Sequence, residues 1–111
     1  MGVPSVGAVV VVPFPFSNLS QYKMRPAVVL ADVDRGDWVV CQITSNSYAD
    51  PHAIFLVADD FATGGLRVGS HARPGKLFTV DESLIVAIEG VLKENALQRV
   101  MEAVVSIFNT G

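Results

Sequence analysis

The sequence predicts a mainly β (α+β) fold, in which a small, strongly bent antiparallel β-barrel is followed by a C-terminal α-helix. Two observations support this prediction. Between residues 8 and 88, short valine-rich runs alternate with turns that contain glycine or proline, and valine favours strands. Between residues 93 and 108 the apolar side chains recur every three or four residues, which indicates an amphipathic helix covering one open end of the sheet.

The N-terminal half is expected to hold three strands. Residues 8–12 form an apolar first strand that Pro13 and Pro15 should end, because proline cannot donate to a strand ladder. A polar loop over residues 17–23 has a length that is typical of functional loops. Strands at 27–31 and 38–42 then form a hairpin around residues 34–37, where Gly36 accommodates a positive φ.

The second half is expected to hold shorter strands at residues 53–58, 69–73, 76–80 and 84–88. Gly64-Gly65 and Pro74-Gly75 are turn dipeptides that separate them. Asp59 and Asp60 are adjacent, and we expect them in a solvated turn.

Composition indicates one domain over residues 1–111 and excludes several classes of protein. Half of the residues are hydrophobic and 17% are charged, which is typical of a globular chain rather than a disordered one. No apolar run is long enough for a membrane helix, and the N-terminus lacks the basic region of a signal peptide. Cys41 has no partner for an internal disulfide, so we expect a packed thiol in a cytoplasmic protein.

The net charge of −3 at first argues against a nucleic-acid partner, but its distribution weakens that objection. Residues 1–80 are balanced, with six basic and six acidic side chains, and residues 81–111 carry the whole deficit. No acidic residue lies within 20–30 or 61–80, where basic residues cluster. These stretches form either a local positive surface or ordinary solvated loops, and composition alone does not separate the two.

Most sequence signatures of catalytic or metal sites are missing. His52 and His71 stand apart, without the spaced Cys and His sets that bind zinc. The chain has no glycine-rich phosphate loop before a helix and no nucleophile elbow. We therefore expect neither a metal ion nor a cofactor.

Arg25 is the strongest candidate for chemistry. Pro26 holds it in extended geometry at the entrance of its strand, and a guanidinium binds phosphate oxygens bidentately. If Asp34 pairs with Asp37, Arg25 opposes Asn46 and Thr44 is its diagonal neighbour on the same face. If the loop is one residue longer, Ser45 faces Arg25 and Thr44 turns away. In the simpler alternative, Arg25 lies at a sheet edge and Thr44 is an ordinary strand residue.

Four stretches of the chain together resemble the MazF/PemK family, the ribonuclease toxins of bacterial type II toxin–antitoxin pairs. Residues 7–18 resemble the opening strand and loop of that family, and residues 73–80 resemble a late strand of one branch. Lys23-Met24-Arg25-Pro26 with the strand that follows, and Ile43-Thr44-Ser45-Asn46, are the specific parts of the match.

The resemblance implies an SH3-like barrel, a homodimer and a cognate antitoxin. It also implies metal-independent, sequence-specific cleavage of single-stranded RNA, in which the ribose 2′-OH attacks its own phosphate. The products are a 2′,3′-cyclic phosphate and a 5′-OH. Arg25 matches the catalytic arginine of the family, and Thr44 matches the hydroxyl that steadies the phosphate. The residues that we expect to bind RNA are Phe16, Asn18, Tyr22, Lys23 and Asn46. Aromatic side chains near the loop at 17–23 are expected to stack on bases, with packing of the barrel rim as the alternative for Phe14 and Phe16.

Two positions depart from the family pattern. Ala8 replaces the acidic residue that usually follows the first glycine, and Arg73 stands where some members have an aspartate base. An arginine is a poor general base, so the group that takes the proton stays open. We expect supporting roles for Ser45, His71, Arg73 or Lys76, with His71 the one nearby group that titrates close to neutral pH. Alternative functions are a non-enzymatic, gyrase-poisoning toxin on the same barrel, or a catalytically degenerate binding barrel.

Overall fold

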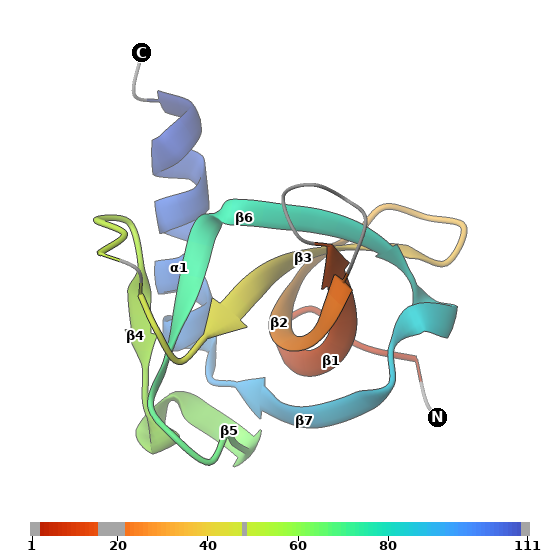
Figure 1. The fold of residues 1–111 in the computed structure, drawn as a ribbon, viewed down its shortest axis with the longest axis horizontal. Helices are drawn as coiled ribbons and strands as arrows, with labels where there is room; N and C mark the ends of the chain where they lie inside the picture. Colours follow the sequence, from red (N-terminus) through yellow and green to blue (C-terminus); the bar gives the residue numbers. More distant parts are fainter. Residues whose placement is uncertain (1–2, 16–21, 48, 110–111) are drawn as a thin grey trace.

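The computed structural model describes residues 3–15, 22–47 and 49–109. Within these residues seven antiparallel strands form one strongly curled sheet, in the order β4-β6-β3-β2-β1-β7-β5, and one α-helix follows (Figure 1). The strands are β1 (Ala8–Pro15), β2 (Tyr22–Asp32), β3 (Asp37–Thr44), β4 (Ile54–Leu56), β5 (Phe61–Gly64), β6 (Ser70–Asp81) and β7 (Ala87–Leu92). The expected bent barrel with a C-terminal helix is confirmed.

The helix, α1 (Glu94–Asn109), lies within one residue of the predicted range at each end. It buries Ala96 and Val100 against the sheet, as the apolar periodicity predicts. Its C-terminal half projects past the edge of the sheet (Figure 1). No helix in the described ranges is long and apolar enough to cross a membrane.

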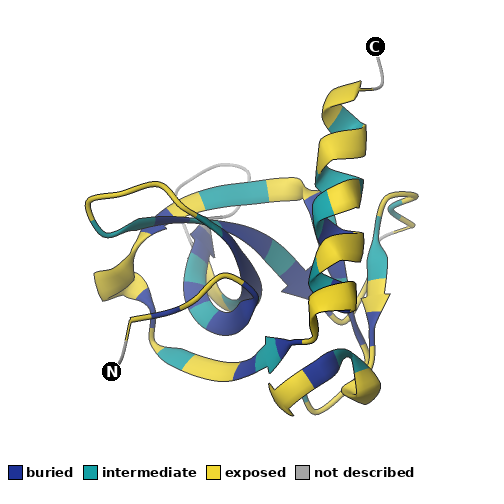
Figure 2. Ribbon diagram, turned by 180° about the vertical axis from the view of Figure 1, so that it is seen from behind, coloured by how far each residue is buried: buried dark blue, intermediate teal, exposed yellow. Residues whose placement is uncertain are grey.

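The central strands are buried on both faces of the sheet, as Figure 2 shows. On the face that α1 covers, Val28, Cys41 and Ile43 belong to one apolar core. On the other face, inside the curl of the sheet, Val29 and Val40 belong to a second core. Because both faces are dry, these strands are apolar throughout instead of alternating between apolar and polar residues.

The predicted turn at residues 34–37 is confirmed. The Asp37 N–H donates to the Asp34 carbonyl over 3.0 Å, and Gly36 has a φ of 81°. Asp34 and Arg35 also adopt positive φ values, 71° and 58°, which the sequence did not indicate. The Asp32 side chain accepts a hydrogen bond from the Asp34 N–H and so supports this backbone.

Next to the turn the hairpin follows the second predicted register, with the longer loop, because Ala31 pairs with Val39 and Asp32 with Trp38. Farther from the turn neither predicted register holds. Ala27 lies opposite Gln42, and an irregularity between Val29 and Ala31 inserts one extra residue in β2. The recorded pairing ends at Ala27 and Gln42, and the same register continued for two residues sets Arg25 opposite Thr44. The bulge thus keeps Thr44 on the face of Arg25, as the first predicted register did, but by a different pairing.

Pro13 and Pro15 do not end the first strand, because β1 continues through both. Val11 accepts a hydrogen bond from the Val86 N–H, so odd-numbered residues here direct their polar groups away from β2. The pairing of β1 with β7 ends at Val11, whereas the pairing with β2 runs on to Pro15. Both prolines therefore lie where no ladder hydrogen bond is required of them.

The second half also differs from the expected strands. β6 is one continuous strand, because residues 73–76 form a bulge opposite the single residue Gln42 instead of a turn. β5 was not predicted. The strand expected at 84–88 is displaced to β7, after a 3₁₀ turn over Glu82–Leu84. The strand expected at 53–58 is the shorter β4, followed by a 3₁₀ turn over Ala58–Asp60.

Asp60 is not in a simple solvated turn. Its carboxylate accepts from the Val57 N–H over 2.8 Å and forms an ion pair with Arg99 of α1 over 2.6 Å. Asp59 is exposed, as expected. The ion pair ties the 3₁₀ turn to the helix.

We predict that Gly90→Ala destabilises the fold. Gly90 pairs with Gly64 across β7 and β5, and an added Cβ would lie 2.5 Å from the Thr63 carbonyl oxygen and 2.8 Å from the Gly65 nitrogen. The clash is with backbone, so the free energy of unfolding should fall by about 1–3 kcal/mol in urea denaturation. Gly75→Ala is the matched control, because the nearest atom to its added Cβ is Ile107 Cδ1 at 3.8 Å. Equal unfolding midpoints for the two variants would contradict the prediction.

Candidate functional site

Arg25 and Thr44 lie on the same face of neighbouring strands, at the end of the sheet where β2 begins and β3 ends. Arg25 is two residues from Ala27, and Thr44 is four residues from Val40. Ala27 and Val40 both belong to the core on the face away from α1. Because side chains alternate along a strand, Arg25 and Thr44 share that face.

Arg25 is half-buried and has no ion-pair partner among the described residues. It lies inside β2 opposite Val12 of β1, not in a solvated loop. Its guanidinium therefore provides a positive charge that no described carboxylate neutralises.

The Thr44 hydroxyl is held by the chain that follows it. The Thr44 residue is 2% exposed, and its Oγ1 accepts a hydrogen bond from the Asn46 N–H over 3.2 Å. Accepting this bond leaves the hydroxyl hydrogen available for donation to another group. The neighbouring Ser45 and Asn46 are exposed.

His71 of β6 lies directly beside Thr44 in the sheet. It pairs with Thr44 on one side and with Phe55 of β4 on the other, and its ring contacts the Phe55 ring at a centroid distance of 4.9 Å. Its Nδ1 is buried and has no hydrogen-bond partner among the described residues. His71 is therefore a neighbour of Thr44 in the sheet.

Arg73 lies two residues from His71, at the start of the β6 bulge. Its Nε donates to Oδ2 of Asp50 over 3.0 Å, and both side chains are largely buried, 19% and 12% exposed. The His52 N–H, and after it the Arg73 guanidinium, lower the pKa of Asp50 below its ordinary value. Sequence reasoning missed Asp50. The Asp50-Pro51 pair signals a turn, but not the partner of the carboxylate.

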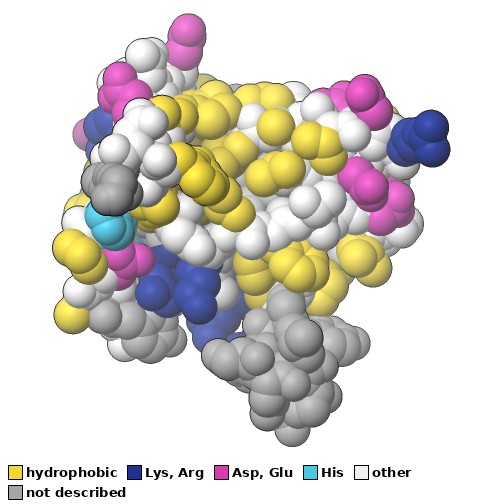
Figure 3. Space-filling model, turned by 90° about the horizontal axis from the view of Figure 1, so that it is seen from above, with side chains coloured by type: hydrophobic (Ala, Val, Ile, Leu, Met, Phe, Trp, Pro, Cys, Tyr) yellow, Lys and Arg dark blue, Asp and Glu magenta, His cyan; other side chains and the backbone are white. Residues whose placement is uncertain are grey.

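Basic side chains gather at this end of the sheet. Figure 3 shows one group of Lys and Arg side chains beside an acidic side chain and a histidine. The described elements place four cations here: Lys23, Arg25, Arg73 and Lys76. Lys23 and Lys76 are exposed, and Asp50 is ion-paired with Arg73 alone among these four. The arrangement fits a polyanion better than a neutral ligand.

The remaining residues that were predicted to contact RNA lie at the ends of β1, β2 and β3 or outside the described residues. Phe16 and Asn18 lie outside the described residues, Tyr22 is the first residue of β2, and Asn46 follows β3. Phe14 is 7% exposed and packs on Phe78 with a ring distance of 5.5 Å. Base stacking by Phe14 is therefore wrong, and its alternative role in packing the barrel is confirmed.

Ala8 and Cys41, two residues that the sequence analysis singled out, are both buried. Ala8 is buried in the core inside the curl, where an acidic side chain would lose its hydration. Cys41 is fully buried, and this burial raises the pKa of its thiol to about 12, which makes it a poor nucleophile. Among the described residues, no group of three His, Cys, Asp or Glu side chains is placed to ligate a metal ion.

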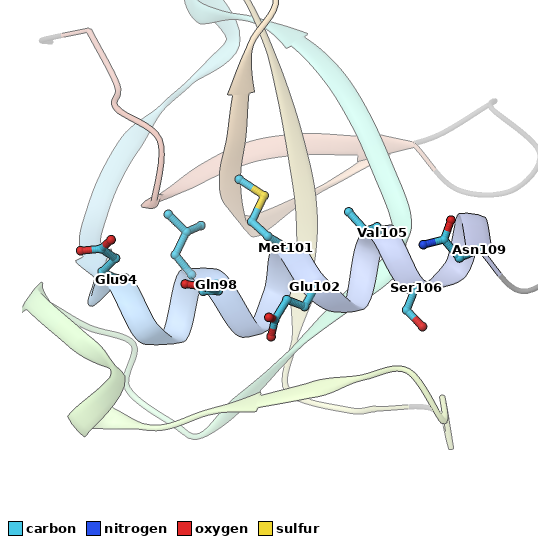
Figure 4. Close-up of a pocket in the computed structure, with 8 residues that line it drawn as sticks. Glu94, Gln98, Met101, Glu102, Val105, Ser106 and Asn109 are labelled. Carbon is cyan, nitrogen blue, oxygen red and sulfur yellow. The ribbon is translucent and has the colours of Figure 1, made fainter.

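A shallow groove of about 620 Å³ runs along one side of α1 (Figure 4). Only α1 residues line it, among them Leu97, Met101, Glu102 and Val105. It contains none of the side chains discussed above, so it is separate from the group of cations.

Several solved structures share this fold over the whole chain. MazF from Deinococcus radiodurans is 22% identical with a TM-score of 0.78, and the match covers 99% of this chain and 100% of that one. A MazE–MazF crystal structure from the same organism matches at 20% identity and a TM-score of 0.73, with 100% of both chains covered. An endoribonuclease in complex with its cognate antitoxin from a mycobacterial species matches at 13% identity and 0.71, covering 100% and 98%.

A comparison with curated proteins gave no match. The model of one protein family, however, matches residues 5–108, which is nearly the whole chain. That match agrees with the stretches around Arg25 and Thr44 that carried the resemblance, and with the fold shared with MazF structures. The chain therefore belongs to the PemK-like, MazF-like toxins of type II toxin–antitoxin systems.

Proposed function

We propose that this toxin is a metal-independent, sequence-specific endoribonuclease that cleaves single-stranded RNA. The observation that carries the proposal is the placement of Arg25 on the same face as Thr44, half-buried, within a group of cations and without an ion-pair partner in the described part of the chain. A fixed guanidinium and a hydroxyl donor are the groups that an RNA phosphate requires when its charge increases. One structural neighbour is described as an endoribonuclease, which supports the same activity.

In the proposed reaction, the ribose 2′-OH loses its proton to a general base and attacks the adjacent phosphorus. The O2′–P bond forms and the P–O5′ bond breaks, leaving a 2′,3′-cyclic phosphate and a 5′-OH once the 5′-oxygen is protonated. The Arg25 guanidinium stabilises the negative charge on the phosphorane-like transition state, an effect worth about 3–4 kcal/mol for a well-placed donor. Arg25 stays charged at every relevant pH, so it is not the base.

Thr44, rather than Ser45, is proposed as the hydroxyl that donates to the phosphate. Its Oγ1 accepts from the Asn46 N–H, so the hydroxyl hydrogen is not used in that bond and can be donated to another group. Ser45 stays a supporting candidate, together with His71, Arg73 and Lys76. Lys23 and Asn46, which are exposed, are proposed to bind RNA along with Phe16, Asn18 and Tyr22.

The proposed partners follow from the family. A cognate antitoxin is expected as a partner, because related structures are MazE–MazF complexes. The family resemblance further suggests that the antitoxin occupies the RNA groove near residues 17–23. We also propose a homodimer in which residues 1–111 act as one toxin domain. The proposed place of action is the cytoplasm, where both the RNA substrate and a reduced Cys41 thiol are expected.

We predict that Arg25→Lys lowers the rate of RNA cleavage by about 10²-fold or more, because lysine cannot reproduce a bidentate, planar contact with phosphate. The measurement uses a long single-stranded RNA incubated with purified protein and EDTA, followed by mapping of the ends. Arg35→Lys is the matched control, because Arg35 is exposed in the turn at the other end of β2. It should cleave like the wild type.

Each outcome of this experiment favours one function. Specific cuts that end in a cyclic phosphate and disappear in Arg25→Lys support the proposed ribonuclease. Intact RNA together with inhibition of DNA gyrase would favour the non-enzymatic toxin. Neither activity would indicate the degenerate barrel.

We predict that Thr44→Val lowers kcat by about 10²-fold, since it removes one donor to the transition state and keeps the shape of the side chain. Thr44→Ser should recover most of the activity because it restores the hydroxyl. Ser45→Ala, which removes a neighbouring hydroxyl from an exposed residue, should have little effect. A larger loss in Ser45→Ala than in Thr44→Val would reverse the assignment. Unfolding curves of all three variants check that the fold is kept.

We predict that His71→Gln flattens the pH–rate profile near neutral pH. His71 pairs with Thr44 in the sheet, so it is placed to transfer a proton at the proposed site, and its removal should remove that contribution to the pH dependence. The measurement is kcat/KM between pH 5 and 9 for both proteins. An unchanged profile would remove His71 from the mechanism.

A further inference from the structure

Asp50 organises the connection between β3 and β4. Its Oδ1 accepts from the His52 N–H over 2.9 Å, and its backbone N–H donates to the Ser47 carbonyl, also over 2.9 Å. The Asp50 carbonyl accepts from the Ala53 N–H over 3.2 Å, so the Asp50 backbone is hydrogen-bonded to residues both before and after it in the chain. Its second carboxylate oxygen, Oδ2, holds Arg73. A single side chain therefore ties this connection to β6.

Arg73 is fixed by its backbone as well as by its side chain. It opens the bulge of β6, and its carbonyl accepts a hydrogen bond from the Cys41 thiol over 3.2 Å. The Asp50 contact is largely buried, so it holds one geometry more firmly than a solvated ion pair does. A long, flexible arginine is thereby reduced to one orientation before any ligand arrives.

The position of Arg73 relates it to the proposed site. His71 pairs with Thr44, and Arg73 follows two residues later as the first residue of the bulge, next to the end of β3 that carries Thr44. Asp50 accepts from Nε, and the guanidinium carries four more N–H donors on its two Nη atoms, which are the type of donor that binds phosphate oxygens. An arginine oriented by a carboxylate in this way suits a phosphate that neighbours the one held by Arg25.

We propose that Asp50 is a positioning residue that holds Arg73 as a binding group for a second, non-scissile phosphate of the RNA substrate. This inference rests on the proposed ribonuclease function. It assigns Arg73 to substrate binding rather than to proton transfer. Asp50 acts only through Arg73 and touches neither the substrate nor the reacting atoms.

The test is a double-mutant cycle of Asp50→Ala and Arg73→Ala, read on the long RNA in EDTA. Arg73→Ala should raise KM about tenfold and change kcat little, as expected for one charged hydrogen-bonding contact. It should also reduce the salt dependence of RNA binding by about 0.7 in the log–log slope. Asp50→Ala should raise KM in the wild-type background and have no further effect in the Arg73→Ala background. Asp50→Asn, which keeps an acceptor, should recover part of the loss.

Arg99→Ala is the matched control. It removes the same type of side chain from the ion pair with Asp60, and it should leave KM and the salt slope unchanged. Unfolding midpoints of all variants separate a general loss of structure from a loss of binding.

Two further results overturn the inference. If Asp50→Ala raises KM equally in both backgrounds, Asp50 does not act through Arg73. If Arg73→Ala binds and cleaves RNA like the wild type, Arg73 does not bind the substrate. Both results leave the ribonuclease function intact.

If the wild type binds the transcript but does not cut it, the ribonuclease function fails alone, and the cycle is then read on RNA affinity. Wild-type protein that neither binds nor cuts the RNA overturns both proposals.

Discussion

The burial of β2 and β3 on both faces is the constraint on which the rest of the structure depends. Val28 and Cys41 pack beneath α1, and Val29 and Val40 pack inside the curl of the sheet. A charged side chain in the middle of either strand would lose its hydration without gaining a partner, at a cost of several kcal/mol. Polar chemistry is therefore confined to the ends of these strands. The candidate site lies at one such end, so packing determines its location as much as its chemistry does.

The bulge of β6 links the curvature of the sheet to the charge of the site. Residues 73–76 lie opposite Gln42 alone, which bends the strand while it stays paired with β3 on both sides of the irregularity. Pro74 is buried there, and the Cys41 thiol donates to the Arg73 carbonyl, which the bulge removes from regular pairing. The same device brings Arg73 and Lys76 to the end of the sheet. The same bulge therefore determines both the curvature of β6 and the position of these two cations.

Features with a local cause were predictable from the sequence. The turn at Gly36 and the helix from Glu94 depend on residues close together in the chain, and both were predicted correctly. The register of the hairpin was not predicted, because no particular residue marks a one-residue bulge beside Leu30 and because both faces of the strand are apolar. β5 depends on the close approach that Gly64 and Gly90 allow, and these two residues lie far apart in the chain. Asp50 and Arg73 are 23 residues apart, and no periodic pattern connects them.

The two dry faces of β2 also affect how the chain reaches its fold. A slip of one residue would exchange Ala27 and Val29 for Val28 and Leu30, so a misaligned hairpin would still bury a comparable apolar surface. Hydrophobic collapse alone discriminates poorly between these two pairings. The choice falls to the turn with three consecutive left-handed residues and to the bulge, both of which form from nearby chain. The turn and the bulge therefore set the pairing, and a slip of one residue from it would turn Thr44 away from the face of Arg25.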